Sequence, residues 1–367
     1  MSQGMKRRII LAIPVVLLFY ISFAAEPLGR EFFLTPVWKY DIFQETGTDH
    51  DYQSVNSGRS DDTAPIDTAV PYHIGNHYGF LSASGRLLGS GEDGSELAIT
   101  FEGFALPLGQ IGRIEFTKPN GKDRKLIEKA GFPFFIGNRK FVMRPDQAGI
   151  CEYNNKGIIL WELEFPSIIT CLASNDLLLV VGLLNGAIQV IHNDGSLVME
   201  HATDGSRISA VYGVAISENS RRIAIISGLD RQTVSIFELQ NKVYRKIFNL
   251  PLYPELRRQI PCTFVADGKL LAFERDGGLA LLDVDTGRLD FRPTGTQISP
   301  FIMVRGSQIA FYAARTKSSV RIIGVGAHGR IDVALAAAGR NVAVQSHSNS
   351  IYLTVDSMIV RLDMEIQ

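Results

Sequence analysis

The stretch that decides the fold is LALLDVDTGRL, residues 279–289. It contains a short apolar run, Leu279–Leu282, then two acidic residues and Gly287, and then apolar Leu289. A short apolar run that ends at a tight turn predicts a β-strand, and glycine supplies the positive φ that such a turn requires. This stretch therefore predicts two strands joined in a β-hairpin.

Hairpin turns of the same kind recur along the chain. Their turn residues, Gly85, Gly121, Gly157, Gly195, Asn241, Gly287 and Gly329, are 36 to 46 positions apart. A unit of about 40 residues has room for four short strands. Amphipathic helices with capping signals are absent after Pro71. The spacing predicts an all-β chain that is built from repeated four-stranded units.

Units with this period are typical of β-propellers, in which twisted sheets are arranged radially as blades. Residues 281–289 (LLDVDTGRL) and 157–162 (GIILWE) resemble repeats of the WD40-like and quinoprotein-like propellers, whose third strand ends in an acidic turn with glycine. The resemblance implies a propeller domain over residues 69–367. The Gly-His to Trp-Asp pairing of true WD40 repeats is absent, and one repeat alone keeps the quinoprotein-like Trp. The resemblance therefore implies an architecture and no particular activity.

The amino-terminal segment decides whether the propeller has eight or seven blades. The last apolar strand is the third of its blade and leaves too few residues for a fourth. Residues 36–43 (PVWKYDIF) look like residues 160–165 (LWELEF), so Trp38 and Tyr40 are candidates for a strand that closes the ring. That arrangement gives eight blades. If residues 70–82 instead complete the first blade, the ring has seven.

The amino terminus has the pattern of an export signal or a membrane anchor. Lys6-Arg7-Arg8 precede 17 uncharged residues, Ile9 to Ala25, which predict a hydrophobic helix. Ser22-Phe23-Ala24 fit a signal peptidase site, which would make residues 1–25 a cleaved signal peptide. The aromatic residues that follow fit an uncleaved anchor instead, with residues 26–43 as a juxtamembrane segment.

Both alternatives carry the rest of the chain out of the cytoplasm, because the positive residues stay on the cytoplasmic side. We expect the protein on the periplasmic side of the inner membrane if the segment is an anchor, and soluble in the periplasm if it is cleaved. Residues 44–68 are polar and acidic, with almost no aliphatic side chains, and predict a flexible linker or loop.

The charge balance excludes general nucleic-acid binding. Lys and Arg number 37 and Asp and Glu 38, whereas a protein that coats DNA or RNA needs a basic excess. The sequence also lacks the G-x-S-x-G, H-E-x-x-H and P-loop patterns, and it has no adjacent cysteines. We therefore expect no catalytic residue, no cofactor and no metal site.

The connection at residues 249–259 is the strongest candidate for a partner-docking loop. Two prolines stiffen it, and the side chains it offers are those of Leu250, Leu252, Tyr253, Leu256, Arg257 and Arg258. Aromatic, aliphatic and Arg side chains on a stiff segment lose little entropy on binding. The alternative is a loop that folds back over its own blade.

Together these features predict a non-catalytic protein–protein interaction scaffold. Its expected partners are other proteins of the cell envelope, and the membrane itself if the amino-terminal segment is uncleaved. The alternative from another class is a propeller enzyme or small-ligand binder, similar to the propeller lactonases and dehydrogenases, that uses the mouth of the central channel.

Overall fold

The computed structural model describes residues 32–44, 53–54, 69–92, 97–109, 112–293, 302–304, 309–315, 319–326, 331–339 and 342–366. The hydrophobic helix expected at residues 1–25 lies outside these stretches. Within them, no helix has the length and hydropathy needed to cross a membrane.

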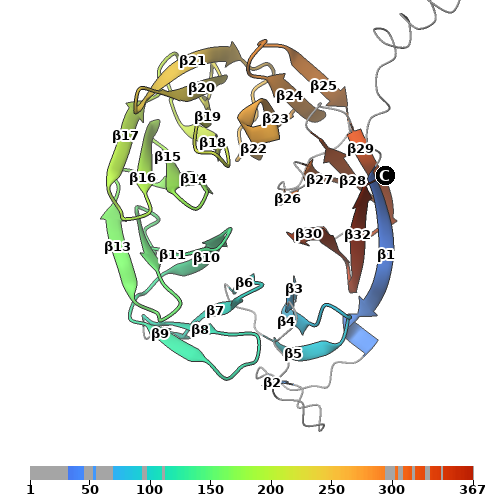
Figure 1. Ribbon diagram of the computed structural model, residues 1–367. Helices are drawn as coiled ribbons and strands as arrows, with labels where there is room; N and C mark the ends of the chain where they lie inside the picture. Colours follow the sequence, from blue (N-terminus) through green and yellow to red (C-terminus); the bar gives the residue numbers. More distant parts are fainter. Residues whose placement is uncertain are drawn as a thin grey trace, which may run out of the picture.

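The described residues form eight four-stranded antiparallel sheets, arranged as blades around a central opening (Figure 1). Eight is the larger of the two blade numbers that the sequence left open. Each blade runs outward from a strand at the opening to a strand at the rim. The prediction of an all-β propeller is confirmed, and so is the resemblance to WD40-like and quinoprotein-like propellers at the level of architecture.

The strands of the first four blades are given from the opening to the rim. The first blade contains β3 (Val70–Ile74), β4 (His77–Leu81), β5 (Leu87–Glu92) and β2 (Gln53–Ser54). The second contains β6 (Ala98–Thr100), β7 (Gly103–Pro107), β8 (Ile114–Thr117) and β9 (Arg124–Ile127). The third contains β10 (Phe132–Ile136), β11 (Arg139–Met143), β12 (Gly149–Tyr153) and β13 (Ile159–Glu164). The fourth contains β14 (Ile169–Ser174), β15 (Leu178–Leu183), β16 (Ala187–His192) and β17 (Leu197–Ala202).

The remaining four blades complete the ring. The fifth contains β18 (Val211–Ile216), β19 (Arg222–Ser227), β20 (Thr233–Gln240) and β21 (Val243–Pro251). The sixth contains β22 (Cys262–Val265), β23 (Leu270–Arg275), β24 (Gly278–Asp283) and β25 (Leu289–Pro293). The seventh contains β26 (Ile302–Val304), β27 (Ile309–Arg315), β28 (Ser319–Val325) and β29 (Ile331–Ala338). The eighth contains β30 (Val342–His347), β31 (Ser350–Val355), β32 (Met358–Ile366) and β1 (Phe32–Asp41). Short 3-10 helices are η1 (Ile42–Gln44) and η3 (Ala266–Gly268).

Part of the stretch predicted as a linker takes part in the first blade. Within residues 44–68 the structure describes Gln44 and Gln53–Ser54, and the latter form β2 and pair with Gly89 and Ser90 of β5. At these two residues the linker prediction is wrong, because the backbone adds an outer strand to a sheet edge. The rest of that prediction lies outside the described residues.

The hydrophobic core is divided into wedges between neighbouring blades, because each sheet is covered on both faces. All six residues of β15 are buried, as expected for a strand with apolar neighbours on two sides. One cluster joins Phe141 and Trp161 of the third blade to Leu179 and Ile191 of the fourth. The contacts that hold the ring together are therefore contacts between blades.

Candidate functional site

The two candidates for a ring-closing strand, Trp38 and Tyr40, lie on β1, which pairs along its length with β32 of the eighth blade. Trp38 is opposite Arg361 and Tyr40 is opposite Ile359. Figure 1 shows the first described strand (blue) beside the last (dark red). The fourth strand of the last blade thus comes from the amino-terminal end of the domain.

Trp38 also joins the eighth blade to the first. Its indole Nε1 donates a hydrogen bond of 2.7 Å to the carbonyl of Ala83. Its ring lies against Gly85, which has a φ of +84° and where a Cβ would come within 2.9 Å of the indole. The ring centroid of Tyr352 is 6.2 Å away. The side chain is half-buried at the seam where the two ends of the ring meet.

Trp161 makes contacts of a similar kind between the third and fourth blades. Its Nε1 donates a hydrogen bond of 3.1 Å to the carbonyl of Asn193, and its ring lies against Gly195, which has a φ of +85°. The two Trp residues are both on outermost strands, but Gly85 lies in a turn from the second to the third strand and Gly195 in a turn from the third to the fourth. In both places an outer-strand Trp caps the glycine turn of the next blade.

The antiparallel blades give the ring two faces. Turns from the first strand to the second and from the third to the fourth lie at one end, which we call the turn face; the remaining turns and the connections between blades lie at the other end, the loop face. In the third to sixth blades the turn face includes residues 137–138, 154–158, 175–177, 193–196, 217–221 and 241–242. The loop face includes residues 165–168, 184–186, 203–210, 228–232 and 252–261.

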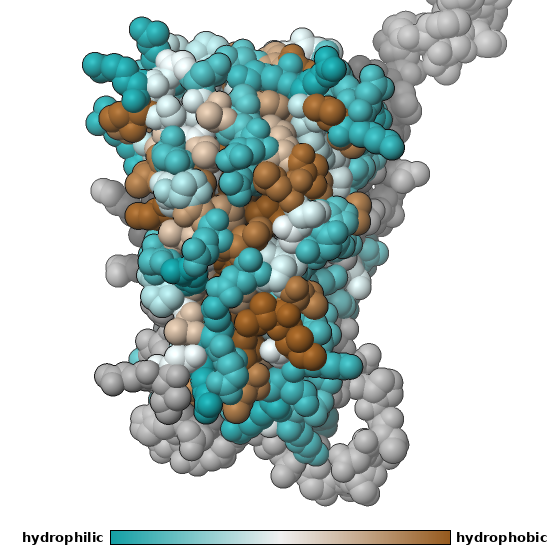
Figure 2. Space-filling view, turned by 90° about the vertical axis from the view of Figure 1, so that its left-hand side faces the viewer, coloured by the Kyte–Doolittle hydropathy of each residue, from teal (hydrophilic) through white to brown (hydrophobic). Residues whose placement is uncertain are grey.

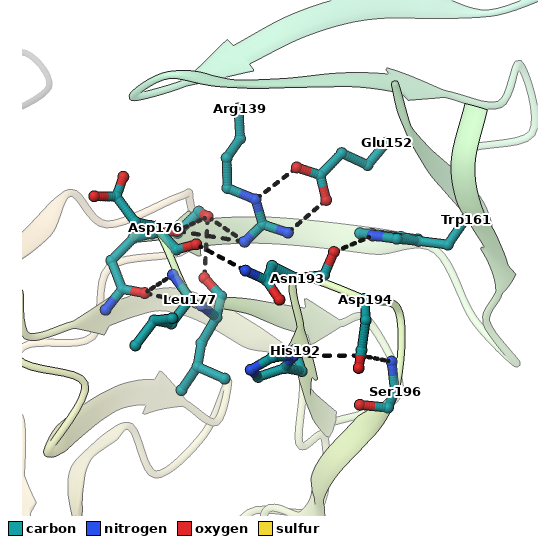
Figure 3. A network of polar contacts seen from close by, with 12 residues as sticks. Arg139, Glu152, Trp161, Asp176, Leu177, His192, Asn193, Asp194 and Ser196 are labelled. Carbon is teal, nitrogen blue, oxygen red and sulfur yellow. Dashed lines mark hydrogen bonds and ion pairs between the residues drawn. The ribbon is translucent and has the colours of Figure 1, made fainter. Parts of the chain in front are cut away.

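A polar network near the turn face ties the third blade to the fourth (Figure 3). The guanidinium of Arg139 donates two hydrogen bonds, of 2.8 and 2.6 Å, to the carboxylate of Glu152, and both side chains are buried. Arg139 also donates to the hydroxyl of Ser174 on β14 at 3.0 Å. The ion pair lies within the third blade and holds the Arg139 side chain in place, and the hydrogen bond from Arg139 to Ser174 links this blade to the fourth.

The network continues into the fifth and sixth blades. The amide of Asn175 donates to the carbonyl of Ser217 at 2.9 Å and to the hydroxyl of Ser220 at 2.7 Å. Asn219 repeats the contact one blade further on, with a bond of 3.0 Å to the carbonyl of Asp267. Four successive blades are thus linked by directed hydrogen bonds at the turn face.

The predicted docking loop is largely a core element, and the prediction of its leucines as partner contacts is wrong. Leu252 is 4% exposed, and Leu250 and Leu256 pack against the same hydrophobic cluster between the fifth and sixth blades. The side-chain amide of Gln232 donates to the carbonyl of Leu256 at 3.0 Å and accepts from its backbone N–H at 3.1 Å. The loop folds back over its own blade, because its apolar side chains complete the core there.

Of the three other predicted docking residues of that loop, Arg258 forms an ion pair within the fold, and Tyr253 and Arg257 are exposed. Arg258 forms two hydrogen bonds, of 2.5 and 2.6 Å, with the buried carboxylate of Glu274. Tyr253 and Arg257 are exposed on the loop face, and the carbonyl of Tyr253 accepts a 2.7 Å hydrogen bond from Arg275.

The loop face carries further exposed apolar residues that the sequence analysis did not single out. Ile168, Leu184 and Ile208 are exposed by 43%, 50% and 52%, and Tyr253 by 57%. Ile168 and Leu184 are neighbours, since the N–H of Leu184 donates to the carbonyl of Ile168 at 2.9 Å. In the sequence, each of these aliphatic residues is recognisable only as a large apolar residue next to a turn residue. Buried residues at strand ends have the same pattern, so the pattern does not distinguish exposed from buried positions.

The loop that carries Ile208 is held by Asp230. Its carboxylate accepts hydrogen bonds from the hydroxyl of Ser206 and from the Arg207 guanidinium, the latter at 3.1 Å. These two contacts lower the pKa of Asp230 to about 2, so the carboxylate stays charged at neutral pH. The Arg207 side chain is 90% exposed and stands beside Ile208.

A cavity of about 280 Å³ is lined by the inner strands of the third to sixth blades, Gln259, Ile260 and Pro261. Burial raises the pKa of the Cys171 thiol at this cavity to about 12, and burial also raises that of the Cys262 thiol. Both thiols are therefore uncharged and are poor nucleophiles and metal ligands. Carboxylate, imidazole, Lys and Arg side chains are absent from the described residues that line the cavity.

Comparison with known proteins supports the architecture. A family described as beta-propeller protein matches residues 1–366. An uncharacterized protein of Treponema pallidum (strain Nichols) is 22% identical over 358 residues, which are 95% of this chain and 91% of that protein.

Two solved structures share the fold. BamB from Moraxella catarrhalis matches with a TM-score of 0.59 at 12% identity, over 90% of this chain and 100% of that one. A chain of the Mitotic Checkpoint Complex matches with a TM-score of 0.53 at 14% identity, over 72% and 87%. At these identities the likeness shows the fold alone. The match over residues 1–366 assigns the chain to the beta-propeller protein family.

Proposed function

We propose that this propeller is a non-catalytic protein–protein interaction scaffold of the cell envelope, exported and held on the periplasmic side of the inner membrane by its amino-terminal segment. Export is supported by the order of Lys6-Arg7-Arg8 and the apolar run Ile9 to Ala25. The partners that fit this role are other envelope proteins.

The observation that carries the interaction role is the exposed apolar group on the loop face. Ile168, Ile208 and Tyr253 lie on the connections between successive blades from the third to the sixth, Leu184 lies on a turn of the fourth blade, and each is exposed by more than two fifths. Large exposed aliphatic and aromatic side chains on neighbouring loops are typical of binding surfaces. Hydrogen bonds of Asp230 to residues 206–207 and of Gln232 to Leu256 hold two of these loops in fixed positions, so little conformational entropy is lost when a partner binds.

The cavity at the inner strands supports the alternative role of enzyme or small-ligand binder less well. Its lining offers hydroxyl and amide groups, but its two thiols are uncharged and no acid or base of ordinary pKa faces it among the described residues. General acid–base or metal-assisted chemistry needs such groups.

Affinity capture of the full-length chain from detergent-solubilised membranes tests the proposal. We expect a stoichiometric partner that Leu184→Glu and Ile208→Glu lose. Ile158→Glu, at an equally exposed position on the turn face, is the matched control and should keep it. Absence of a stoichiometric partner together with a tightly bound metal or small molecule would reverse the assignment in favour of the channel.

A further inference from the structure

The rim of the ring is the second surface with an unusual composition. The outermost strands of the second to fifth blades expose large aliphatic side chains, namely Leu126, Leu160, Leu197, Val198, Val243 and Ile247. Figure 2 shows hydrophobic groups (brown) among hydrophilic ones on this side of the molecule. Exposed apolar residues on edge strands mark places where another polypeptide can pair with the sheet.

Among these rim strands, β21 is the longest. It has nine residues, whereas β13 and β17 have six each and β9 has four. It is the last strand in the order β18-β19-β20-β21 and pairs with β20 alone. Its outer side therefore presents backbone N–H and C=O groups with no neighbouring strand in the described part of the chain.

The side chains of β21 combine apolar and basic groups. Val243 is 58% exposed and Ile247 is 38% exposed, and Arg245 and Lys246 between them are exposed as well. Lys242 precedes the strand and is also exposed, and residues 243–251 contain no acid.

The acidic side chains near this strand form ion pairs with other basic residues or with Lys246. Asp204 forms an ion pair with Lys246 at 3.3 Å. Glu238 is opposite Arg245 in the register, but its carboxylate accepts hydrogen bonds of 3.1 and 3.0 Å from Arg222. Lys242 and Arg245 have no ion pair among the described residues. The edge thus offers two positive charges to an incoming chain.

We propose that the outer edge of β21 binds an extended, acidic segment of a partner protein, which adds a fifth strand to the fifth blade. Backbone hydrogen bonds along β21 supply affinity, Val243 and Ile247 contact apolar side chains of the segment, and Lys242 and Arg245 pair with its acids. The proposal rests on the scaffold function and names one partner chemistry for it, on a surface separate from the loop face.

The same charges explain why the edge stays open in the isolated chain. Positive side chains on an exposed edge oppose pairing with the identical edge of a second copy. The edge therefore discriminates against self-association and favours an acidic strand. The short β9 is also basic, but Arg124 lies 3.6 Å from Glu115, and four residues give few backbone hydrogen bonds.

The test is fluorescence anisotropy with the full-length chain in detergent and a labelled ten-residue peptide of alternating Val and Glu. Binding should weaken at least about tenfold in the double variant Lys242→Glu/Arg245→Glu. Arg124→Glu/Lys125→Glu on β9 removes the same charge from another rim strand, and it should bind as the wild type does. Lys246 is left unchanged because it contacts Asp204.

Two further measurements separate strand pairing from charge attraction and from misfolding. A Val–Glu peptide that is N-methylated at alternate residues keeps the charge but cannot pair, and wild-type protein should not bind it. Equal binding of the N-methylated peptide, or of a Val–Lys peptide, overturns the proposal, and so does unchanged binding by a folded Lys242→Glu/Arg245→Glu variant. Ile208→Glu should bind the Val–Glu peptide normally, so failure of this proposal is distinguishable from failure of the loop-face scaffold.

Discussion

Replacement of Trp38 by Ala should destabilise the whole ring, because this side chain joins the first and last blades. Half of the ~150–250 Å² that a buried aromatic side chain covers, at ~25 cal/mol/Å², corresponds to about 2–3 kcal/mol. Loss of the 2.7 Å bond to Ala83 adds less than about 1 kcal/mol, since Arg361 also donates to that carbonyl at 2.7 Å. We expect a total of about 3 kcal/mol.

Trp161→Ala is the matched control. Trp161 has a similar hydrogen bond and glycine contact between two internal blades but is only 9% exposed, so its loss should cost at least as much. Differential scanning calorimetry of the full-length chain should give a melting temperature about 5–10 °C lower for either variant. Deletion of residues 32–43 should have a larger effect and should promote aggregation, because it leaves β32 with an open edge.

Residues 32–43 do not close the ring if Trp161→Ala lowers the melting temperature while Trp38→Ala and the deletion leave it unchanged. That pattern would mean that residues 32–43 act as a juxtamembrane spacer. The same variants would then change membrane or partner association without an effect on unfolding.

Three other outcomes follow from the described contacts. Glu152→Gln should destabilise the chain by about 3–5 kcal/mol in denaturant titrations, because it leaves the buried Arg139 without its counter-ion; an effect below about 1 kcal/mol would contradict a structural role for the pair. The folded-state pKa of Asp230, about 2, is lower than that of an unfolded Asp, so its contribution to stability is present above about pH 4 and is lost as the pH falls toward 2. Between pH 4 and pH 2, the melting temperature of Asp230→Asn should therefore fall less than that of the wild type, and equal decreases in the two proteins would refute this. Cys171, which is 5% exposed, should not react with a thiol reagent at pH 8 until the chain unfolds, because burial raises its pKa to about 12; rapid modification of Cys171 in the native protein would contradict its burial.

Local signals were enough to predict the blades. Turn residues such as Gly195 and Gly287 are required by positive φ values of +85° and +71°, so their spacing reports the repeat directly. The ring-closing position of Trp38 also had a local signal, since the residues around it look like those around Trp161.

Contacts between distant segments had no such signal. Leu252 looks like an exposed loop residue in the sequence, and only the wedge between two blades makes it a core residue. Ile208 has an ordinary aliphatic identity, and its exposure depends on how Asp230 holds its loop. The Asn175 bonds to Ser217 and Ser220 join residues more than forty positions apart, a distance at which turn chemistry gives no information.

The most direct test of the scaffold account is photo-crosslinking in intact cells, with a photoreactive amino acid placed at Ile208 or at the control position Ile158. The account predicts a discrete crosslinked product with an envelope protein from position 208 and none from position 158. Crosslinking from position 158 alone, or no protein product from position 208 while the variant is folded and present in the envelope, would contradict the loop face as the docking surface.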